Sequence, residues 1–170
     1  MKKIAVLLED YFNEFEVIYP YYRLKEAGFD SVLVAPEKKA YHSKAGLVIA
    51  SEMSIDEVNS EEFYGVVIPG GYAPDRLRRS EKILKFVKTM FDQEKLVASI
   101  CHGGWVLISA HIVNGVTLTS FYAIKDDLKN AGAKYVDEEV VVDGNLITSR
   151  SPEDLPAFMR EAIKFLNGKE

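Results

Sequence analysis

Residues 96–105, Leu-Val-Ala-Ser-Ile-Cys-His-Gly-Gly-Trp, restrict the fold more than any other part of the chain. Residues 96–100 form a short apolar run rich in β-formers, which predicts a fully buried strand. Residues 105–113 place apolar side chains at helical spacing, which predicts a helix. Only Cys101, His102 and two glycines separate the two elements. A tight strand-to-helix turn is therefore predicted, with cysteine in the position of the nucleophile in a nucleophile elbow.

The position of Cys101 also predicts reactivity. The turn lies at the carboxyl end of a strand, which is where open α/β sheets form their ligand sites. It also lies near the positive end of the following helix dipole, so we expect the thiol to lose its proton more easily than a free cysteine.

The rest of the chain alternates strands with helices, which predicts a doubly wound, mostly parallel α/β sheet with helices on both faces. The first strand (4–8), the third (63–68) and the strand before Cys101 should be central. The other predicted strands are 29–35 and 116–120; the predicted helices are 13–27, a turn at 75–79, 80–93, 122–130 and 152–166; the hairpins are an excursion at 38–51 and residues 136–148.

Composition limits the classes of function. A chain of 170 residues suits a single domain, residues 1–170, and 48% hydrophobic residues suit a globular protein. The net charge of −5 argues against nucleic acid and anionic membranes as partners. No apolar run is long enough to span a membrane, and no signal peptide is evident, so a cytoplasmic protein is expected. The single cysteine excludes an internal disulfide and a multi-thiolate metal site.

Two further loops place functional groups near Cys101. The third strand ends in Pro69-Gly70-Gly71, and paired glycines allow backbone N–H groups to point into a cavity, as an oxyanion site requires. Glu16 lies in the first turn of a helix that follows the first strand. If Glu16 is buried against the sulfur, desolvation should raise its pKa. No cofactor or metal is expected, because a phosphate-loop signature is absent and the glycines lack dinucleotide-site spacing.

Taken in order, several motifs resemble the PfpI intracellular-protease family, in the superfamily that includes the Parkinsonism-associated protein deglycase. The resemblance covers essentially the whole chain. It rests on Asn13-Glu-Phe-Glu16, Pro69-Gly-Gly71, Ala98-Ser-Ile-Cys-His-Gly103, Ile124-Lys-Asp-Asp127, Glu139-Val-Val-Val-Asp-Gly144 and Thr148-Ser-Arg150.

The resemblance implies a flavodoxin-like fold and assigns roles to individual residues. Cys101 is the implied nucleophile, His102 its partner base and Glu16 a buried carboxyl in contact with the thiol. Asp75 occupies the position of an acid that completes the triad of a neighbouring subunit. The backbone N–H groups of Gly71 and His102 are the implied oxyanion hole. The expected pocket residues are Gly70, Gly103, Trp105 and Phe121, the last at a position where the family commonly has tyrosine.

Three functions remain open on these residues. The first is a PfpI-type cysteine hydrolase, in which a thiolate attacks a carbonyl group of a peptide or a small carbonyl adduct. The second is a glyoxalase or deglycase that acts on methylglyoxal and glycated groups under stress. The third is a redox-sensing or chaperone-like protein without turnover. A homo-oligomer, dimer or hexamer, is expected, and aromatic residues on and before the first helix (Tyr11, Phe12, Tyr19, Tyr21, Tyr22) suit an interface.

Overall fold

The computed structural model describes residues 1–168, and its centre is a seven-stranded sheet in the order β10-β11-β7-β6-β1-β2-β5. All pairings in this sheet are parallel except that of β10 with β11. The strands are β1 (Lys3–Leu7), β2 (Asp30–Ala35), β5 (Met53–Ser54), β6 (Phe63–Ile68), β7 (Leu96–Ile100), β10 (Val141–Asp143) and β11 (Leu146–Ser149). The predicted mixed α/β architecture is confirmed, with β7, β6 and β1 in the centre.

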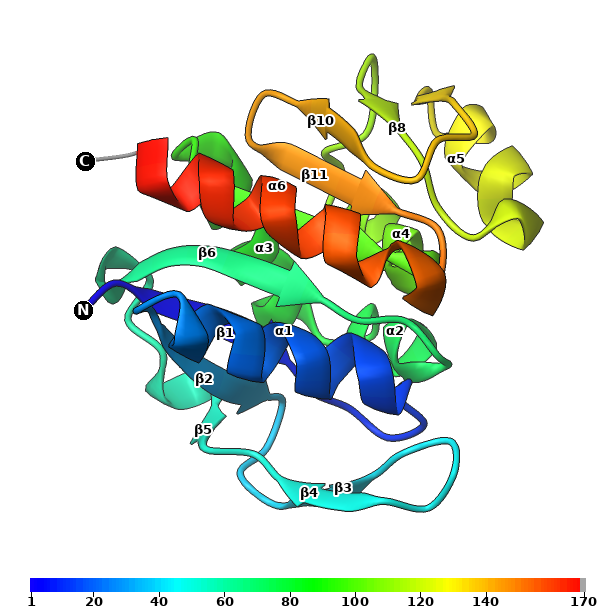
Figure 1. Ribbon diagram of the computed structural model, residues 1–170. Helices are drawn as coiled ribbons and strands as arrows, with labels where there is room; N and C mark the ends of the chain where they lie inside the picture. The colour runs from blue at the N-terminus through cyan, green and yellow to red at the C-terminus, as the bar shows by residue number, and fades with distance from the viewer. Residues whose placement is uncertain (169–170) are drawn as a thin grey trace.

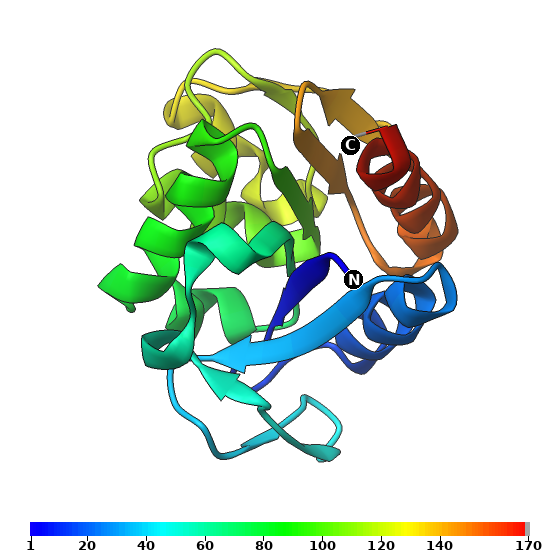
Figure 2. The same ribbon diagram turned by 90° about the vertical axis from the view of Figure 1, so that its left-hand side faces the viewer.

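Helices cover both faces of the sheet (Figure 1). Helices α1 (Glu14–Glu26) and α6 (Leu155–Gly168) pack on one face, and α2 (Ala73–Leu77), α3 (Glu81–Asp92) and α4 (Gly104–Ser109) lie on the other, as the turned view of Figure 2 shows. The short helix α5 (Lys125–Asn130) packs against α4. The side chains of the central strands are almost fully buried between these two layers, and this burial is the main stabilising term of such a fold.

The first helix shows how local sequence sets an element that later carries the site. The side chain of Asn13 accepts hydrogen bonds from the backbone N–H groups of Phe15 and Glu16, at 3.0 and 3.3 Å. These bonds satisfy two of the donors that every helix start leaves free. The cap therefore fixes Glu16 in the first turn of α1, at the carboxyl end of β1.

The excursion at 38–51 is confirmed as a two-stranded hairpin, β3 (Ala40–His42) with β4 (Val48–Ala50). The strand predicted at 116–120 is shorter than expected and lies outside the main sheet. Only β8 (Thr117–Leu118) forms, and it pairs with β9 (Lys134–Tyr135) in a small separate sheet. Residues 117–118 do not join the main sheet, because β11 already pairs with the free edge of β7.

The second predicted hairpin is shorter than expected. Its first strand, β10, begins at Val141, and the residues before it bond elsewhere. The carbonyl group of Glu139, for example, accepts a hydrogen bond of 2.6 Å from the Ser149 hydroxyl. No helix in the described part of the chain is long and apolar enough to cross a membrane.

Candidate active site

Cys101 lies in a sharp turn between β7 and α4. It opens the short 3₁₀ helix η3 (Cys101–Gly103), and its backbone φ is +61°. A side chain in this left-handed region is strained by roughly 1–2 kcal/mol, and such strain collects at functional sites. The predicted nucleophile elbow is therefore present, and it lies at the carboxyl edge of the sheet.

The turn brings the side chains of two adjacent residues together. His102 Nδ1 lies 3.3 Å from Cys101 Sγ, although neighbours on a regular helix point in different directions. Burial, and then the positive charge of Lys44, holds the pKa of His102 below its usual value. The imidazole is thus neutral near pH 7, and a neutral ring nitrogen at this distance can accept the thiol proton.

The prediction of an easily ionised thiol is wrong. Burial raises the pKa of Cys101 to about 12, and the negative charge of Glu16 raises it further toward that value. Backbone N–H groups of His102 and Gly71 bond the sulfur and act in the opposite direction. The helix behind the turn has only six residues, so its dipole is too weak to outweigh burial. The thiol proton must therefore leave to a base as the sulfur reacts.

Glu16 is completely buried beside the sulfur. Its Oε1 accepts a 2.9 Å hydrogen bond from the Gly70 N–H, and its Oε2 has no hydrogen-bond partner among the described residues. Burial raises the pKa of Glu16 to about 7, as desolvation predicts.

Gly70 separates the carboxyl group from the thiol. A Cβ on Gly70 would lie 2.6 Å from Glu16 Oε1 and 3.1 Å from Cys101 Sγ. Any side chain at this position would collide with both groups, so only glycine lets the Glu16 carboxyl group and the Cys101 sulfur lie on either side of the backbone here. No hydrogen bond joins the carboxyl group to the sulfur within the described residues; Glu16 is bonded to the Gly70 N–H.

Backbone contacts join three loops around the site. Phe12 forms β-bridges to Gly71 on one side and to Ser43 on the other. The Tyr72 N–H donates to the Tyr11 carbonyl group at 2.8 Å. These contacts fix the N–H of Gly71, whose φ of +71° favours glycine, in its position at the sulfur.

The predicted pocket residues have different surroundings. The rings of Trp105 and Phe121 flank the His102 imidazole, at centroid distances of 5.2 and 5.0 Å. Gly103 faces the sheet instead, because a Cβ there would lie 2.6 Å from Ser99 Oγ. Trp105 and Phe121 therefore form walls beside the base, and Gly103 permits close packing of the turn.

Asp75 is not brought to the site within one chain. It lies on α2 with half of its side chain exposed and forms an ion pair with Arg79, one turn along. Among residues 1–168, no carboxylate forms a hydrogen bond or ion pair with His102.

Comparison with known proteins identifies the family of the chain. The model of the DJ-1/PfpI family matches residues 2–165. The chain belongs to the DJ-1/PfpI family. Deglycase PfpI of Pyrococcus furiosus is 46% identical over 164 residues, which cover 96% of this chain and 99% of the relative. Protein/nucleic acid deglycase 2 of Escherichia coli is 41% identical over 168 residues, covering 97% and 98% of the two chains. The crystal structure of Drosophila melanogaster DJ-1beta superimposes with a TM-score of 0.92 at 30% identity, covering 99% of this chain and 91% of the other.

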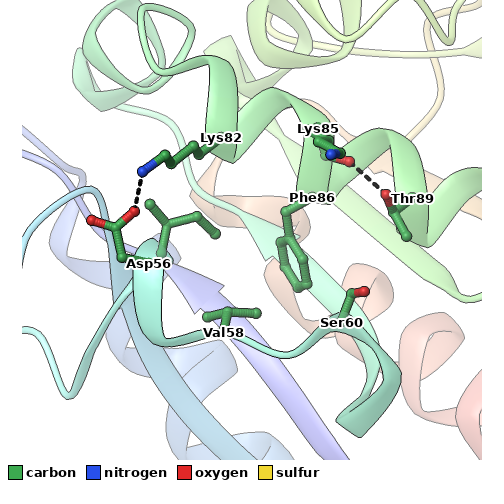
Figure 3. A pocket seen from close by; sticks show the side chains of 8 residues that line it. Asp56, Val58, Ser60, Lys82, Lys85, Phe86 and Thr89 are labelled. Carbon is green, nitrogen blue, oxygen red and sulfur yellow. Dashed lines mark hydrogen bonds and ion pairs between the residues drawn. The ribbon is translucent and has the colours of Figure 1, made fainter.

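A separate cavity of about 340 Å³ lies away from the cysteine of this DJ-1/PfpI chain (Figure 3). Phe86 and Val58 line its apolar side, and an ion pair between Asp56 and Lys82 closes one end. The cavity lies beside a 3₁₀ helix that leads into the amino end of β6, whereas Cys101 follows the carboxyl end of the parallel strand β7. It therefore belongs to the opposite edge of the sheet.

Two residues at the edge of the cysteine site, which we call its rim, were not predicted from the sequence. Lys44 and Tyr72 lie beside the site, with the Lys44 ammonium 5.2 Å from the centroid of the Tyr72 ring. Lys44 belongs to the excursion hairpin, and no motif marks it. Within residues 1–168, no group of three metal-binding side chains lies close enough together to hold an ion.

Proposed function

We propose that this DJ-1/PfpI chain is a cysteine-dependent deglycase that removes methylglyoxal from glycated groups and releases it as a 2-hydroxycarboxylate. The observation that carries the proposal is the buried Glu16 carboxyl group beside Cys101, with an unpartnered Oε2 and a pKa of about 7. A carboxyl group with a pKa near the working pH exchanges protons efficiently in both directions. The deglycase names of the relatives support the same choice.

The reaction follows from the positions of the groups. The Cys101 sulfur attacks the carbonyl-derived carbon of the adduct, the thiol proton passes to His102 Nδ1, and the amine or thiol of the glycated group leaves with a proton. The sulfur then holds a 2-oxo hemithioacetal. Backbone N–H groups of Gly71 and His102 supply donors for the oxyanion that develops there.

The second half of the reaction requires an acid–base group. A proton must move from the carbon that bears sulfur to the neighbouring carbonyl carbon, which converts the hemithioacetal to a 2-hydroxyacyl thioester. Glu16 has a free oxygen and a suitable pKa for this transfer. Water then cleaves the thioester and restores the thiol. The reaction as a whole needs neither an oxidant nor a reductant.

The test compares three substrates at equal protein concentration: free methylglyoxal, methylglyoxal-treated N-acetylarginine, and an unmodified peptide. Products are identified by NMR. We expect lactate together with recovered N-acetylarginine, and no conversion by Cys101→Ser. Raising the adduct concentration at a fixed concentration of free methylglyoxal should raise the rate.

Each other outcome contradicts the deglycase proposal. A rate that depends only on free methylglyoxal identifies a glyoxalase. Peptide cleavage without lactate identifies a peptidase. The absence of all conversion, together with oxidation of Cys101 by peroxide, identifies a sensor.

We also propose that a second copy of the chain completes the site through Asp75. The exposed aromatic residues on and before α1 suit such a contact, since Tyr11 and Tyr22 are 48% and 63% exposed and Phe15 is 66% exposed. Phe12, in contrast, is fully buried in the core.

Subunit mixing tests the shared site. Asp75→Asn should lower kcat at least tenfold, because a base without its orienting carboxylate typically loses catalytic efficiency. Co-assembly of Asp75→Asn with Cys101→Ser should restore part of the activity, since one mixed site then holds both Cys101 and Asp75. A monomer in light scattering, or unaltered kcat of Asp75→Asn, would refute the proposal.

A further inference from the structure

Lys44 is held at the rim of the site by its backbone. It lies at the tip of the β3–β4 hairpin, and its N–H donates to the Phe12 carbonyl group at 3.0 Å. The next residue, Ala45, donates its N–H to Glu14 Oε1 at 2.7 Å. The hairpin tip is thus attached to the start of α1, two residues before Glu16.

The Lys44 side chain turns toward the reacting groups. Its ammonium lies over the Tyr72 ring, and that ring lies 6.4 Å from the His102 ring, centroid to centroid. The positive charge lowers the pKa of Glu16, Cys101 and His102 alike. The Lys44 ammonium is therefore close enough to the site to act on all three groups.

No ion pair within residues 1–168 includes Lys44. Glu14, to which the hairpin tip is attached, accepts hydrogen bonds from Ser43 and Ala45, and the positive charge of Lys44 also lowers the pKa of Glu14 without an ion pair being formed. Lys44 is exposed and lies over an aromatic face, and such a cation remains available for an anionic ligand.

We propose that Lys44 binds the carboxylate of the compound held at Cys101 and so makes the site selective for anions. The inference rests on the proposed function for the source of the carboxylate, which is either a carboxylate-bearing carbonyl substrate or the 2-hydroxycarboxylate product. The ammonium forms a charge-assisted hydrogen bond with the carboxylate while the sulfur contacts the adjacent carbon.

Selective alkylation tests the charge directly, because the chain has a single cysteine. Iodoacetate and iodoacetamide have nearly the same shape and differ by one negative charge. We expect Lys44→Met to lower the ratio of the iodoacetate rate constant to the iodoacetamide rate constant at Cys101 about tenfold. Lys44→Arg should preserve this ratio. Any change in the thiol itself cancels in the ratio. The readout does not require turnover, so it is independent of the proposed function.

The matched control is Lys85→Met. Lys85 lines the cavity at the opposite edge of the sheet (Figure 3), and its replacement should leave the ratio unchanged. An unchanged ratio in Lys44→Met, or an equal fall in both lysine variants, would overturn the proposal.

Two further measurements distinguish the sources of the carboxylate. If the product carboxylate binds Lys44, lactate should protect Cys101 of the wild type from iodoacetamide and should not protect Lys44→Met. If the carboxylate of a carbonyl substrate binds, glyoxylate, which can only form a reversible hemithioacetal with Cys101, should protect Cys101 of the wild type from iodoacetamide at about tenfold lower concentration than it protects Lys44→Met. The absence of both effects would overturn the assignment to carboxylates.

Discussion

Replacement of Glu16 by glutamine should increase the free energy of unfolding by about 3 kcal/mol more at pH 8 than at pH 4.5. The carboxyl pKa is about 7 in the folded protein and 4.5 in the reference state. The folded state therefore binds the proton more tightly, and the stability of the wild type falls as the pH rises from 4.5 to 7. Glutamine cannot ionise and avoids this loss.

Thermal or urea unfolding of both proteins across this pH range measures the effect. Other titrating groups are common to the two proteins, so they cancel in the difference. Glu14→Gln is the matched control. Burial raises the pKa of Glu14, but hydrogen bonds from Ser43 and Ala45 outweigh it and the net pKa is lowered. Its replacement should therefore not stabilise the protein at pH 8. A pH-independent difference for Glu16→Gln would contradict the assigned ionisation.

Replacement of Gly71 by alanine should lower the free energy of unfolding by about 3 kcal/mol or more. A Cβ there would lie 2.5 Å from the Tyr11 carbonyl oxygen and 2.6 Å from the Asn13 nitrogen. Both are backbone atoms, so no side chain can rotate away. The same variant should lose activity, because the displaced loop carries the N–H group that bonds the sulfur.

The variant Gly115→Ala distinguishes the cost of a left-handed backbone from the cost of the steric overlap expected in Gly71→Ala. Gly115 has a similar φ of +78°, but nothing lies within 4 Å of its would-be Cβ. Its replacement should cost only about 1 kcal/mol, from the left-handed backbone alone. Urea unfolding of both variants gives the comparison, and equal losses would show that the contact with Tyr11 and Asn13 does not matter.

The sequence predicted the parts of the fold that local pattern determines. The bounds of β6 and β7 agree with the apolar runs at 63–68 and 96–100, because strands buried on both faces are hydrophobic throughout. The helix predicted at 80–93 begins where expected, because the Ser80 side chain accepts a hydrogen bond from the Ile83 N–H at 3.3 Å and caps α3. The partner of residues 116–120 could not be predicted, because period and composition do not determine which strand a segment pairs with.

The sequence indicated which residues gather at the site, but it did not indicate the pKa of the cysteine. Cys101, Glu16 and Gly71 were marked by loops at the ends of central strands, and parallel strands bring such loops to one edge. The pKa of Cys101 depends on how completely the surrounding loops bury it, which the turn sequence does not reveal. Lys44 escaped prediction for a related reason, since its position depends on the docking of a hairpin.

The two bridges of Phe12 have a consequence for motion. Local opening in proteins occurs in cooperative units whose members exchange their amide hydrogens together. Phe12 joins the loop after β1, the glycine turn after β6 and the hairpin tip, so release of this one segment frees all three. If this segment opened to admit substrate, the Gly71 N–H, the Glu16 carboxyl group and the Lys44 ammonium would all lose their positions together. We therefore expect the amide hydrogens of these three segments to exchange together.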